Sequence, residues 1–196
     1  FKKKHQGITE YLAKCFKSKD KEVMLIFNKR ISVSPITTHV PISNVSKQIE
    51  KNKIVKKVMT INKFYLQKFN IRPKIHILGL NPHNFSPNKH SEEKLSIVPA
   101  IKQLKKNKIK VYGPISPDTS FLFNKKNKPN VIVGMYHDQV LLPFKTIFKY
   151  DAINITLGLP FIRVSPDHGV GENITGKNVA NPKSLIESIK FFSLIK

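Results

Sequence analysis

Short apolar runs alternate along the chain with stretches in which apolar residues recur every three or four positions. The first pattern is typical of buried β-strands and the second of amphipathic helices. The runs that predict strands are 22–27, 31–37, 74–80, 108–113, 130–136, 152–158 and 161–165. The stretches that predict helices are 43–69 with an internal break, a segment opening at residue 91, 139–148 and 181–192.

Two of the predicted helices carry recognisable start signals. Ser91, Glu92 and Glu93 open one helix with acidic residues in its first turn, where the helix dipole favours negative charge. In the last helix Asn181 is a suitable N-cap, and Pro182 suits the first helical position because its missing N–H would be unpaired there anyway.

Strands separated by helices predict a layered α/β fold with a largely parallel sheet and flanking helices. The chain has 196 residues, of which 40% are hydrophobic, which suffices for one substantial core. Because there is no internal repeat and no low-complexity linker, no firm domain boundary can be drawn.

Polar clusters follow four of the predicted strands: "TTHV", "NPHN", "GPISPDT" and "HDQ". In open α/β sheets the ligand crevice lies beyond the carboxyl ends of the strands. Three of these clusters contain a histidine, namely His39, His83 and His137. Three neutral imidazoles with an open fourth position form a catalytic divalent-metal arrangement. Each histidine could equally be a capping or hydrogen-bonded loop residue, so the metal site is one of two interpretations.

The net charge of +23 and the pI near 10.1 raise the question of nucleic-acid binding. The lysines are spread over nearly all predicted helices and turns, and no RNA-recognition or zinc-finger pattern occurs, so we predict no nucleic-acid partner.

No stretch approaches the roughly 18 to 20 uncharged apolar residues of a membrane helix, and we expect no membrane association and a cytoplasmic location. The single cysteine, Cys15, is expected to be a small core residue.

The segments "TTHVP", "GLNPH", "GPISPDT", "MYHDQ" and "NITLGLPFIRVSPDHG" occur in this order between residues 37 and 169. Together they resemble the 4-hydroxythreonine-4-phosphate dehydrogenase family of vitamin B6 biosynthesis. The resemblance implies that residues 1–196 are the C-terminal two-thirds of such an enzyme, with the family's N-terminal third lacking. It also implies a fold like that of isocitrate and isopropylmalate dehydrogenases, a homodimer with its active site between subunits, NAD as cofactor, and zinc, magnesium or cobalt as a divalent metal.

The resemblance carries over to individual residues. The implied metal ligands are His39, His83 and His137, with the first two from one chain and His137 from its partner. The implied contacts to a phosphorylated small-molecule substrate are Thr9, Lys145, Asn154 and Arg163. The two cationic members suit this substrate, because a lysine offers a compact cationic donor and an arginine a planar fork for phosphate or carboxylate.

Two departures from the family pattern stand out. The family's "GHTE" motif is "GITE" here, so Thr9 is kept while Ile8 replaces a histidine that helps to hold the substrate. The glycine-rich continuation after "NPH" is "NFSPNKH" here, which changes the local loop. An isoleucine cannot donate a hydrogen bond, so the substrate pocket is altered at this point.

The implied reaction oxidises the C3 hydroxyl of 4-phosphooxy-L-threonine by hydride transfer to NAD, and loss of CO2 then gives 3-amino-2-oxopropyl phosphate. Asp118 and Asp138 are candidates for the general base, but each could equally orient a histidine or cap a helix. The sequence has no GxGxxG motif for NAD. The alternatives are a dehydrogenase of threonate or erythronate phosphate, a decayed phosphate-ligand binding protein, or a basic nucleic-acid binder.

Overall fold

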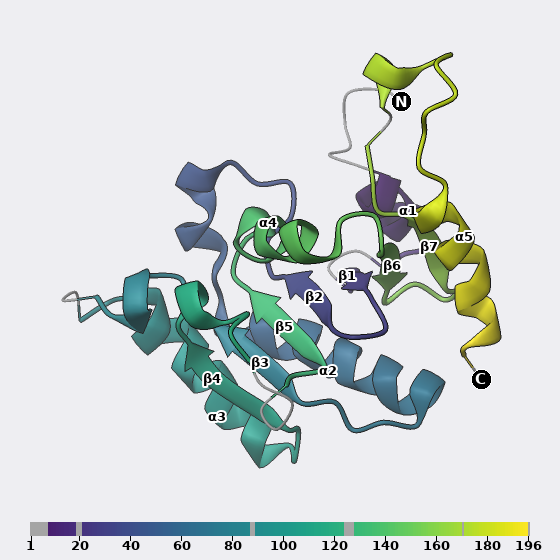
Figure 1. Cartoon of the computed structure of the whole chain (residues 1–196). Coiled ribbons are helices and arrows are strands. Elements are labelled where there is room, and N and C mark those ends of the chain that lie inside the picture. Colours follow the sequence, from purple (N-terminus) through teal and green to yellow (C-terminus); the bar gives the residue numbers. More distant parts are fainter. Residues whose placement is uncertain (1–7, 19–20, 87–88, 124–127, 170, 196) are drawn as a thin grey trace.

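The computed structural model describes residues 8–18, 21–86, 89–123, 128–169 and 171–195, which form a seven-stranded sheet with helices on both faces (Figure 1). The strands are β1 Val23–Phe27, β2 Ser32–Pro35, β3 Ile75–Leu78, β4 Val111–Ile115, β5 Val131–Gly134, β6 Ile153–Leu157 and β7 Arg163–Pro166. The α-helices are α1 Ile8–Cys15, α2 Lys51–Phe69, α3 Val98–Lys106, α4 His137–Phe148 and α5 Lys183–Lys190. Each predicted strand and helix is confirmed, and α1 is an addition.

The strands lie in the order β4-β3-β5-β2-β1-β6-β7. The first four run parallel to one another, whereas β1 is antiparallel to both β2 and β6, and β7 is antiparallel to β6. Five of the seven strands therefore point in one direction, which confirms the layered α/β prediction. In the antiparallel pairs β1–β2 and β6–β7, the second strand follows the first closely in sequence. A short loop allows only antiparallel pairing, because parallel neighbours need a longer crossover connection.

One face of the sheet packs against α2, α3 and the C-terminal segment (Figure 1). Alternate strand residues such as Val23, Leu25, Val131 and Val133 point to this face, as the two-residue period of a strand requires. They meet the apolar stripe of α2, which includes Ile54, Val55, Val58, Ile61, Phe64 and Tyr65.

The opposite face is covered by α4 (Figure 1). Here Ile26, Val33 and Ile132 of the strands pack against Phe144 and its neighbours on the helix. The strands in the middle of the sheet are thus buried on both sides, which explains why their sequences are continuously apolar.

The predicted helix signals are found with small shifts. The break in 43–69 corresponds to two short 3₁₀ turns, Ile42–Asn44 and Ser46–Gln48, before α2. The segment opening at residue 91 begins with a π-helical stretch, Glu93–Ile97, that leads into α3. Helix α5 begins one residue later than predicted, with Pro182 rather than Asn181 as its N-cap, and the Oδ1 of Asn181 accepts a hydrogen bond from the amide of Lys183 at 3.0 Å.

The prediction that Cys15 belongs to the core is wrong, because its side chain is exposed. Ala13 is the buried residue of this turn of α1, with 1% of its surface accessible. Two positions along a helix correspond to a rotation of roughly 200°, so Cys15 points away from the side that Ala13 buries.

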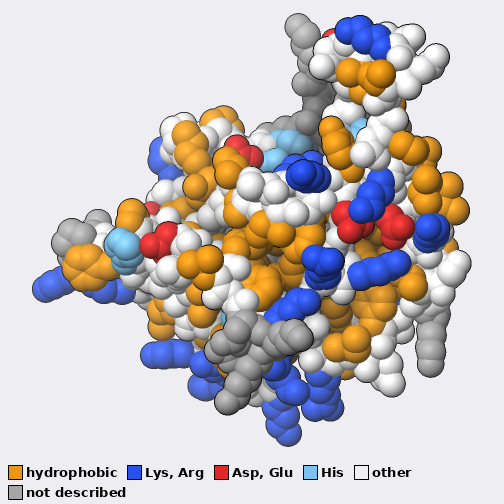
Figure 2. Space-filling view, viewed as in Figure 1, with side chains coloured by type: hydrophobic (Ala, Val, Ile, Leu, Met, Phe, Trp, Pro, Cys, Tyr) orange, Lys and Arg blue, Asp and Glu red, His pale blue; other side chains and the backbone are white. Residues whose placement is uncertain are grey.

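Charged side chains are distributed widely over the surface. Figure 2 shows Lys and Arg side chains over several parts of the visible face, interleaved with apolar and neutral ones. None of the helices in the described part of the chain is long and apolar enough to cross a membrane.

Candidate active site

Two of the three strand-end histidines lie beside each other. Strands β2 and β5 are parallel neighbours, so the segments that follow them leave the sheet at the same edge. The carbonyl of Met135 accepts hydrogen bonds from the Thr37 hydroxyl at 2.8 Å and from the Thr37 amide at 3.1 Å. This clamp brings together His39 and His137, whose ring centroids lie 6.5 Å apart with the ring planes at 33°.

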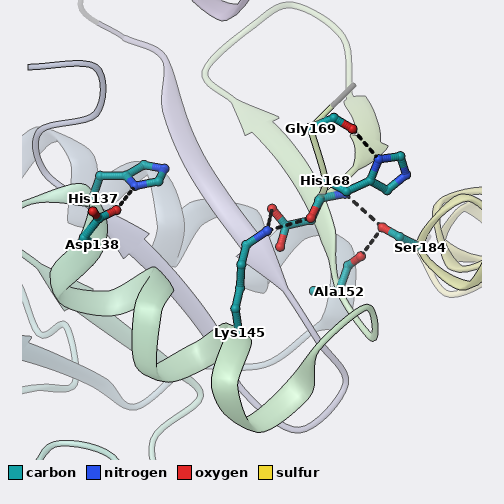
Figure 3. Close-up of polar contacts among 8 residues, drawn as sticks. His137, Asp138, Lys145, Ala152, His168, Gly169 and Ser184 are labelled. Carbon is teal, nitrogen blue, oxygen red and sulfur yellow. Dashed lines mark hydrogen bonds and ion pairs between the residues drawn. The ribbon is translucent and has the colours of Figure 1, made fainter. Parts of the chain in front are cut away.

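His137 is the first residue of α4, and the next residue is placed to orient it. The Nδ1 of His137 lies 2.6 Å from Oδ1 of Asp138 (Figure 3). When Nδ1 donates its proton to that carboxylate, Nε2 keeps a lone pair for a metal. Asp138 therefore has the geometry of an orienting residue, which was one of its predicted roles.

Gln139 ties the ends of two strands together. Its Oε1 accepts a hydrogen bond from the Met135 amide at 2.6 Å, and its Nε2 donates to the carbonyl of Gly79 at 2.8 Å. A Cβ at Gly134 would lie 2.9 Å from the Gln139 Oε1, so the absence of a side chain there leaves room for the contact. Gln139 thus links the end of β5 to the loop that follows β3.

That loop carries His83 in an unusual backbone conformation. His83 and Asn84 have φ angles of 54° and 57°, in the left-handed region that non-glycine residues rarely adopt. Each such residue costs on the order of 1 kcal/mol or more, and positions of this kind cluster at functional sites. The loop is held by the Asn84 side chain, which donates to the carbonyl of Pro114 at 3.0 Å.

His83 lies next to Asp118, which follows β4. Its Nδ1 is 3.6 Å from Oδ2 of Asp118. A hydrogen bond from the Ser116 hydroxyl, together with the neighbouring histidine, lowers the pKa of the Asp118 carboxyl. Asp118 is thus an anion that can orient His83, the second role that its sequence position allowed.

The loop before His83 is anchored by a buried carboxylate. Glu93, which is 4% exposed, accepts hydrogen bonds from the amides of Leu80 at 2.9 Å and Asn81 at 2.8 Å, and from the Asn81 side chain at 2.8 Å. Burial works to raise the pKa of Glu93, but the hydrogen bonds from Asn81 and Leu80 outweigh it and the pKa is lowered. The carboxylate is therefore the form that the fold stabilises.

We expect Glu93→Gln to destabilise the protein by about 1.5–3 kcal/mol at neutral pH. The side-chain NH2 group of glutamine would face the N–H groups of Leu80 and Asn81, which now donate to the Glu93 carboxylate. The folded-state pKa lies below the ordinary value of 4.5, so this stabilisation is complete above pH 4.5 and is lost as the pH falls through the folded-state pKa. Urea unfolding at a series of pH values measures both effects. Glu172→Gln, at an exposed position, is the matched control, and an equal loss in the two variants would contradict the anchoring role.

The third histidine does not join the other two within one chain. Among the described residues, no three side chains of His, Cys, Asp or Glu are placed to hold one metal ion. The chain brings His39 and His137 together and places His83 beside Asp118. The three-histidine site stays a prediction.

Two of the predicted substrate residues share the face of the sheet that α4 covers. Asn154 pairs with Ile26 of β1, whose side chain belongs to the α4-side core, and Thr156 pairs with Arg163 of β7. Directly opposed residues and alternate residues of a strand point to one face. Asn154, Thr156 and Arg163 therefore lie on the α4 side, where Arg163 Nη1 donates to the Thr156 hydroxyl at 3.0 Å.

Lys145 reaches towards the same region from α4. Its ammonium donates to the main-chain carbonyl of Asp167 at 2.7 Å and lies 3.3 Å from the Asp167 carboxylate (Figure 3). Asp167 directly follows β7, the strand that carries Arg163. Three predicted substrate residues thus lie on the same side of the sheet, on α4, β6 and β7.

Thr9 lies on α1, an element that carries none of these three residues. It is half-buried on α1, and within the described residues no hydrogen bond joins it to Lys145, Asn154 or Arg163. The end of α1 packs its Phe16 ring against Phe161, in the β6–β7 connection, with ring centroids 4.9 Å apart. The predicted role of Thr9 in substrate binding stays a prediction.

The sequence model of the family described as "Pyridoxal phosphate biosynthetic protein PdxA" matches residues 2–192. The chain belongs to the PdxA family. It is 46% identical over 194 residues to a 4-hydroxythreonine-4-phosphate dehydrogenase of Sulfurihydrogenibium sp. (strain YO3AOP1), covering 98% of the chain and 59% of that relative.

A D-threonate 4-phosphate dehydrogenase of Pectobacterium atrosepticum is 33% identical over 187 residues, covering 95% of the chain and 57% of that protein. The crystal structure of 4-hydroxythreonine-4-phosphate dehydrogenase from Klebsiella pneumoniae superposes with a TM-score of 0.80 at 32% identity, covering 96% of the chain and 57% of that structure. The chain thus spans less than two thirds of the length of these PdxA-like relatives.

Three polar residues around the site of this PdxA family member escaped the sequence reasoning. Gln139 follows the "HD" pair directly, and Glu93 was interpreted only as a helix-start residue. Asp167 stands in the quoted segment "SPDHG" without an assigned role. The available signal was a polar residue next to an implied ligand or strand end. Each of the three has a hydrogen-bond partner 12 or more residues away, which only the fold reveals.

Proposed function

We propose that this chain forms part of an NAD-dependent and divalent-metal-dependent dehydrogenase of vitamin B6 biosynthesis. It would oxidise and decarboxylate 4-phosphooxy-L-threonine to 3-amino-2-oxopropyl phosphate. The observation that carries the proposal is the placement of His137 and Lys145 eight residues apart on one helix, α4. This is about 12 Å along the axis, a separation that the two side chains can bridge towards one small bound molecule.

The donor set suits a divalent metal. Imidazole nitrogens are common ligands of zinc and cobalt, and two of the implied ligands, His39 and His137, lie side by side. The neighbouring carboxylates of Asp138 and Asp118 are placed to fix the orientation of His137 and His83. When bound, the metal would supply Lewis-acid stabilisation of negative charge on the substrate oxygen.

The residues of the chain itself would bind and orient the substrate. Lys145 and Arg163 supply cationic donors for the phosphate and carboxylate groups, and Asn154 supplies an amide that can both donate and accept. Held in this way, the carbon that bears the C3 hydroxyl would be presented for hydride transfer to NAD. The resulting β-keto acid would then lose CO2.

The site would be shared by two subunits of a homodimer. The resemblance implies His39 and His83 from one chain with His137 from its partner. Because His39 and His137 are neighbours within one chain, we propose that these two act together and that the third ligand is the partner subunit's His83. In both of these arrangements, one chain alone supplies only two of the three metal ligands of a site.

A second candidate is a dehydrogenase of D-threonate 4-phosphate or the related erythronate. It is favoured by Ile8, which stands where the family has a substrate-binding histidine and which is 47% exposed at the start of α1. A relative whose name gives this activity is 33% identical to the chain.

The test measures NADH formation with 4-phosphooxy-L-threonine, D-threonate 4-phosphate and D-erythronate 4-phosphate, each with zinc, magnesium or cobalt. We expect NADH and CO2 in equal amounts from the first substrate. In Ile8→His we expect its KM to fall by about tenfold with little change in kcat, because a polar contact is restored. NADH from a threonate or erythronate phosphate alone would favour the second candidate. Substrate binding without any NADH would indicate a decayed binding protein.

A further inference from the structure

A buried ion pair joins α4 to the segment that follows β7. The side chain of Asp167 is 8% exposed, and its Oδ1 lies 3.3 Å from the ammonium of Lys145, which is 41% exposed (Figure 3). In the other ion pairs of the described residues, the acidic side chain is at least 22% exposed. Asp167 is therefore an unusually buried partner for a lysine at a substrate site.

Asp167 is held from the opposite side by α5. Its amide donates to the hydroxyl of Ser184 at 2.8 Å, and that hydroxyl donates in turn to the carbonyl of Ala152. Ser184 is 1% exposed. The backbone of Asp167 is thus fixed by two layers of the fold, α4 on one side and α5 on the other.

The carboxylate is not fully satisfied by the surrounding protein. Within the described residues, Oδ2 of Asp167 is buried and has no hydrogen-bond partner, and the same is true of Oδ1 of Asn154. Burial raises the pKa of the Asp167 carboxyl, and the ammonium of Lys145 offsets only part of that effect. Keeping a carboxylate at such a position is unfavourable unless its charge serves a partner.

The partner that uses this charge is Lys145. A lysine ammonium has three N–H donors. Within the described residues, Lys145 donates to the main-chain carbonyl of Asp167 and pairs with its carboxylate. One donor remains for an anionic ligand, and it is held near the α4-side face of β6 and β7, which carries Asn154 and Arg163.

We propose that Asp167 is a positioning residue of the substrate site, whose buried carboxylate fixes the Lys145 ammonium where the phosphorylated acid binds. This inference rests on the proposed function. The flexible four-carbon stem of a free lysine would sample many rotamers, and the ion pair restricts them before the ligand arrives. Asp167 thus acts through Lys145.

A double-mutant cycle tests this role in the full chain, with 4-phosphooxy-L-threonine as the probe. We expect Asp167→Asn to raise KM by roughly tenfold with kcat changed by less than about twofold, because Lys145 holds the substrate in both ground and transition states. In a Lys145→Met background the same Asp167→Asn substitution should change KM by less than about twofold, because the lysine it positions is gone.

The matched control is Asp151→Asn, which removes the carboxylate of an exposed pair with Lys183 at 3.4 Å and should leave KM unchanged. If Asp167→Asn does not fold, Ser184→Ala replaces it. That variant keeps the Asp167 carboxylate and removes the hydroxyl that binds the Asp167 amide and the Ala152 carbonyl. We expect a KM increase of about threefold there.

An unchanged KM in a folded Asp167→Asn protein would overturn the positioning role. So would an equal rise of KM in the Lys145→Met background, because the effect would then not pass through Lys145. If the unsubstituted protein neither binds nor oxidises 4-phosphooxy-L-threonine, the proposed function fails and this inference fails with it. That failure is visible without any substitution.

Discussion

Proteins carrying His83→Ala or His137→Ala are each expected to lose metal binding and to lose turnover by more than about 100-fold. Each substitution removes one of three proposed ligands from every site of a homodimer, and an incomplete imidazole set does not hold a divalent ion tightly. The unsubstituted protein should bind roughly one divalent ion per subunit. Metal content after dialysis and NADH formation measure the two effects independently.

Unfolding and refolding the two inactive proteins together should restore activity. In a mixed dimer one site collects both substitutions, while the other receives intact His83 from one chain and intact His137 from the other. Equal mixing makes about half of the dimers mixed, and each mixed dimer has one intact site of two. About a quarter of the original turnover should therefore return. Native mass spectrometry confirms that mixed dimers have formed.

Two further mixtures distinguish how the ligands are divided. If His39 and His137 come from one chain, as their 6.5 Å ring separation suggests, a mixture of His39→Ala and His137→Ala stays inactive. A mixture of His39→Ala and His83→Ala then regains activity. The family resemblance implies that His39 and His83 come from one chain and His137 from its partner. Activity in the first of these two mixtures and none in the second would support that division. Activity in none of the three mixtures would mean that the histidines do not form a shared site.

Phe144→Ala is expected to lower the free energy of unfolding by about 3–5 kcal/mol. Phe144 is fully buried on the side of α4 that faces the sheet, and its ring packs against Phe148 with centroids 4.8 Å apart. Truncation removes the aromatic ring and leaves a cavity that the β-strands below cannot fill. Urea unfolding at neutral pH measures the loss.

Leu142→Ala is the control on the same helix. Leu142 is 66% exposed, so its truncation should change the free energy of unfolding by no more than about 0.5 kcal/mol. Similar losses in the two variants would contradict the packing of α4 on this face of the sheet. A loss confined to Phe144→Ala would confirm that the helix carrying His137 and Lys145 is held by its apolar side.

Most elements of the fold could be predicted because their local patterns are strong. The sequence of β1 is apolar at consecutive positions because its side chains face both cores. Leu25 points towards α2, and Ile26 points towards α4. The order of the strands could not be predicted, because apolar residues do not specify which neighbour they will meet. The insertion of β1 between β2 and β6, antiparallel to both, is set by pairing between distant segments.

The site was partly predictable for the same reasons. The strand-end rule led to His39 and His137, which the structure brings together. The separate position of His83 depends on the left-handed backbone at that residue and on the anchoring of its loop by Glu93, which come from tertiary contacts. Lys145 was implied by the resemblance, but its partner lies 22 residues further along the chain.

A single helix, α4, begins with His137 and carries Lys145, so the proposed metal and the proposed phosphorylated acid would be held by the same element. Because the proposed metal would contact an oxygen of the proposed substrate, each ligand would tighten the binding of the other, and linkage requires the same factor in both directions. Such reciprocity ties metal occupancy to metabolite supply. Where free metal is scarce, the enzyme would retain its ion best when substrate is plentiful.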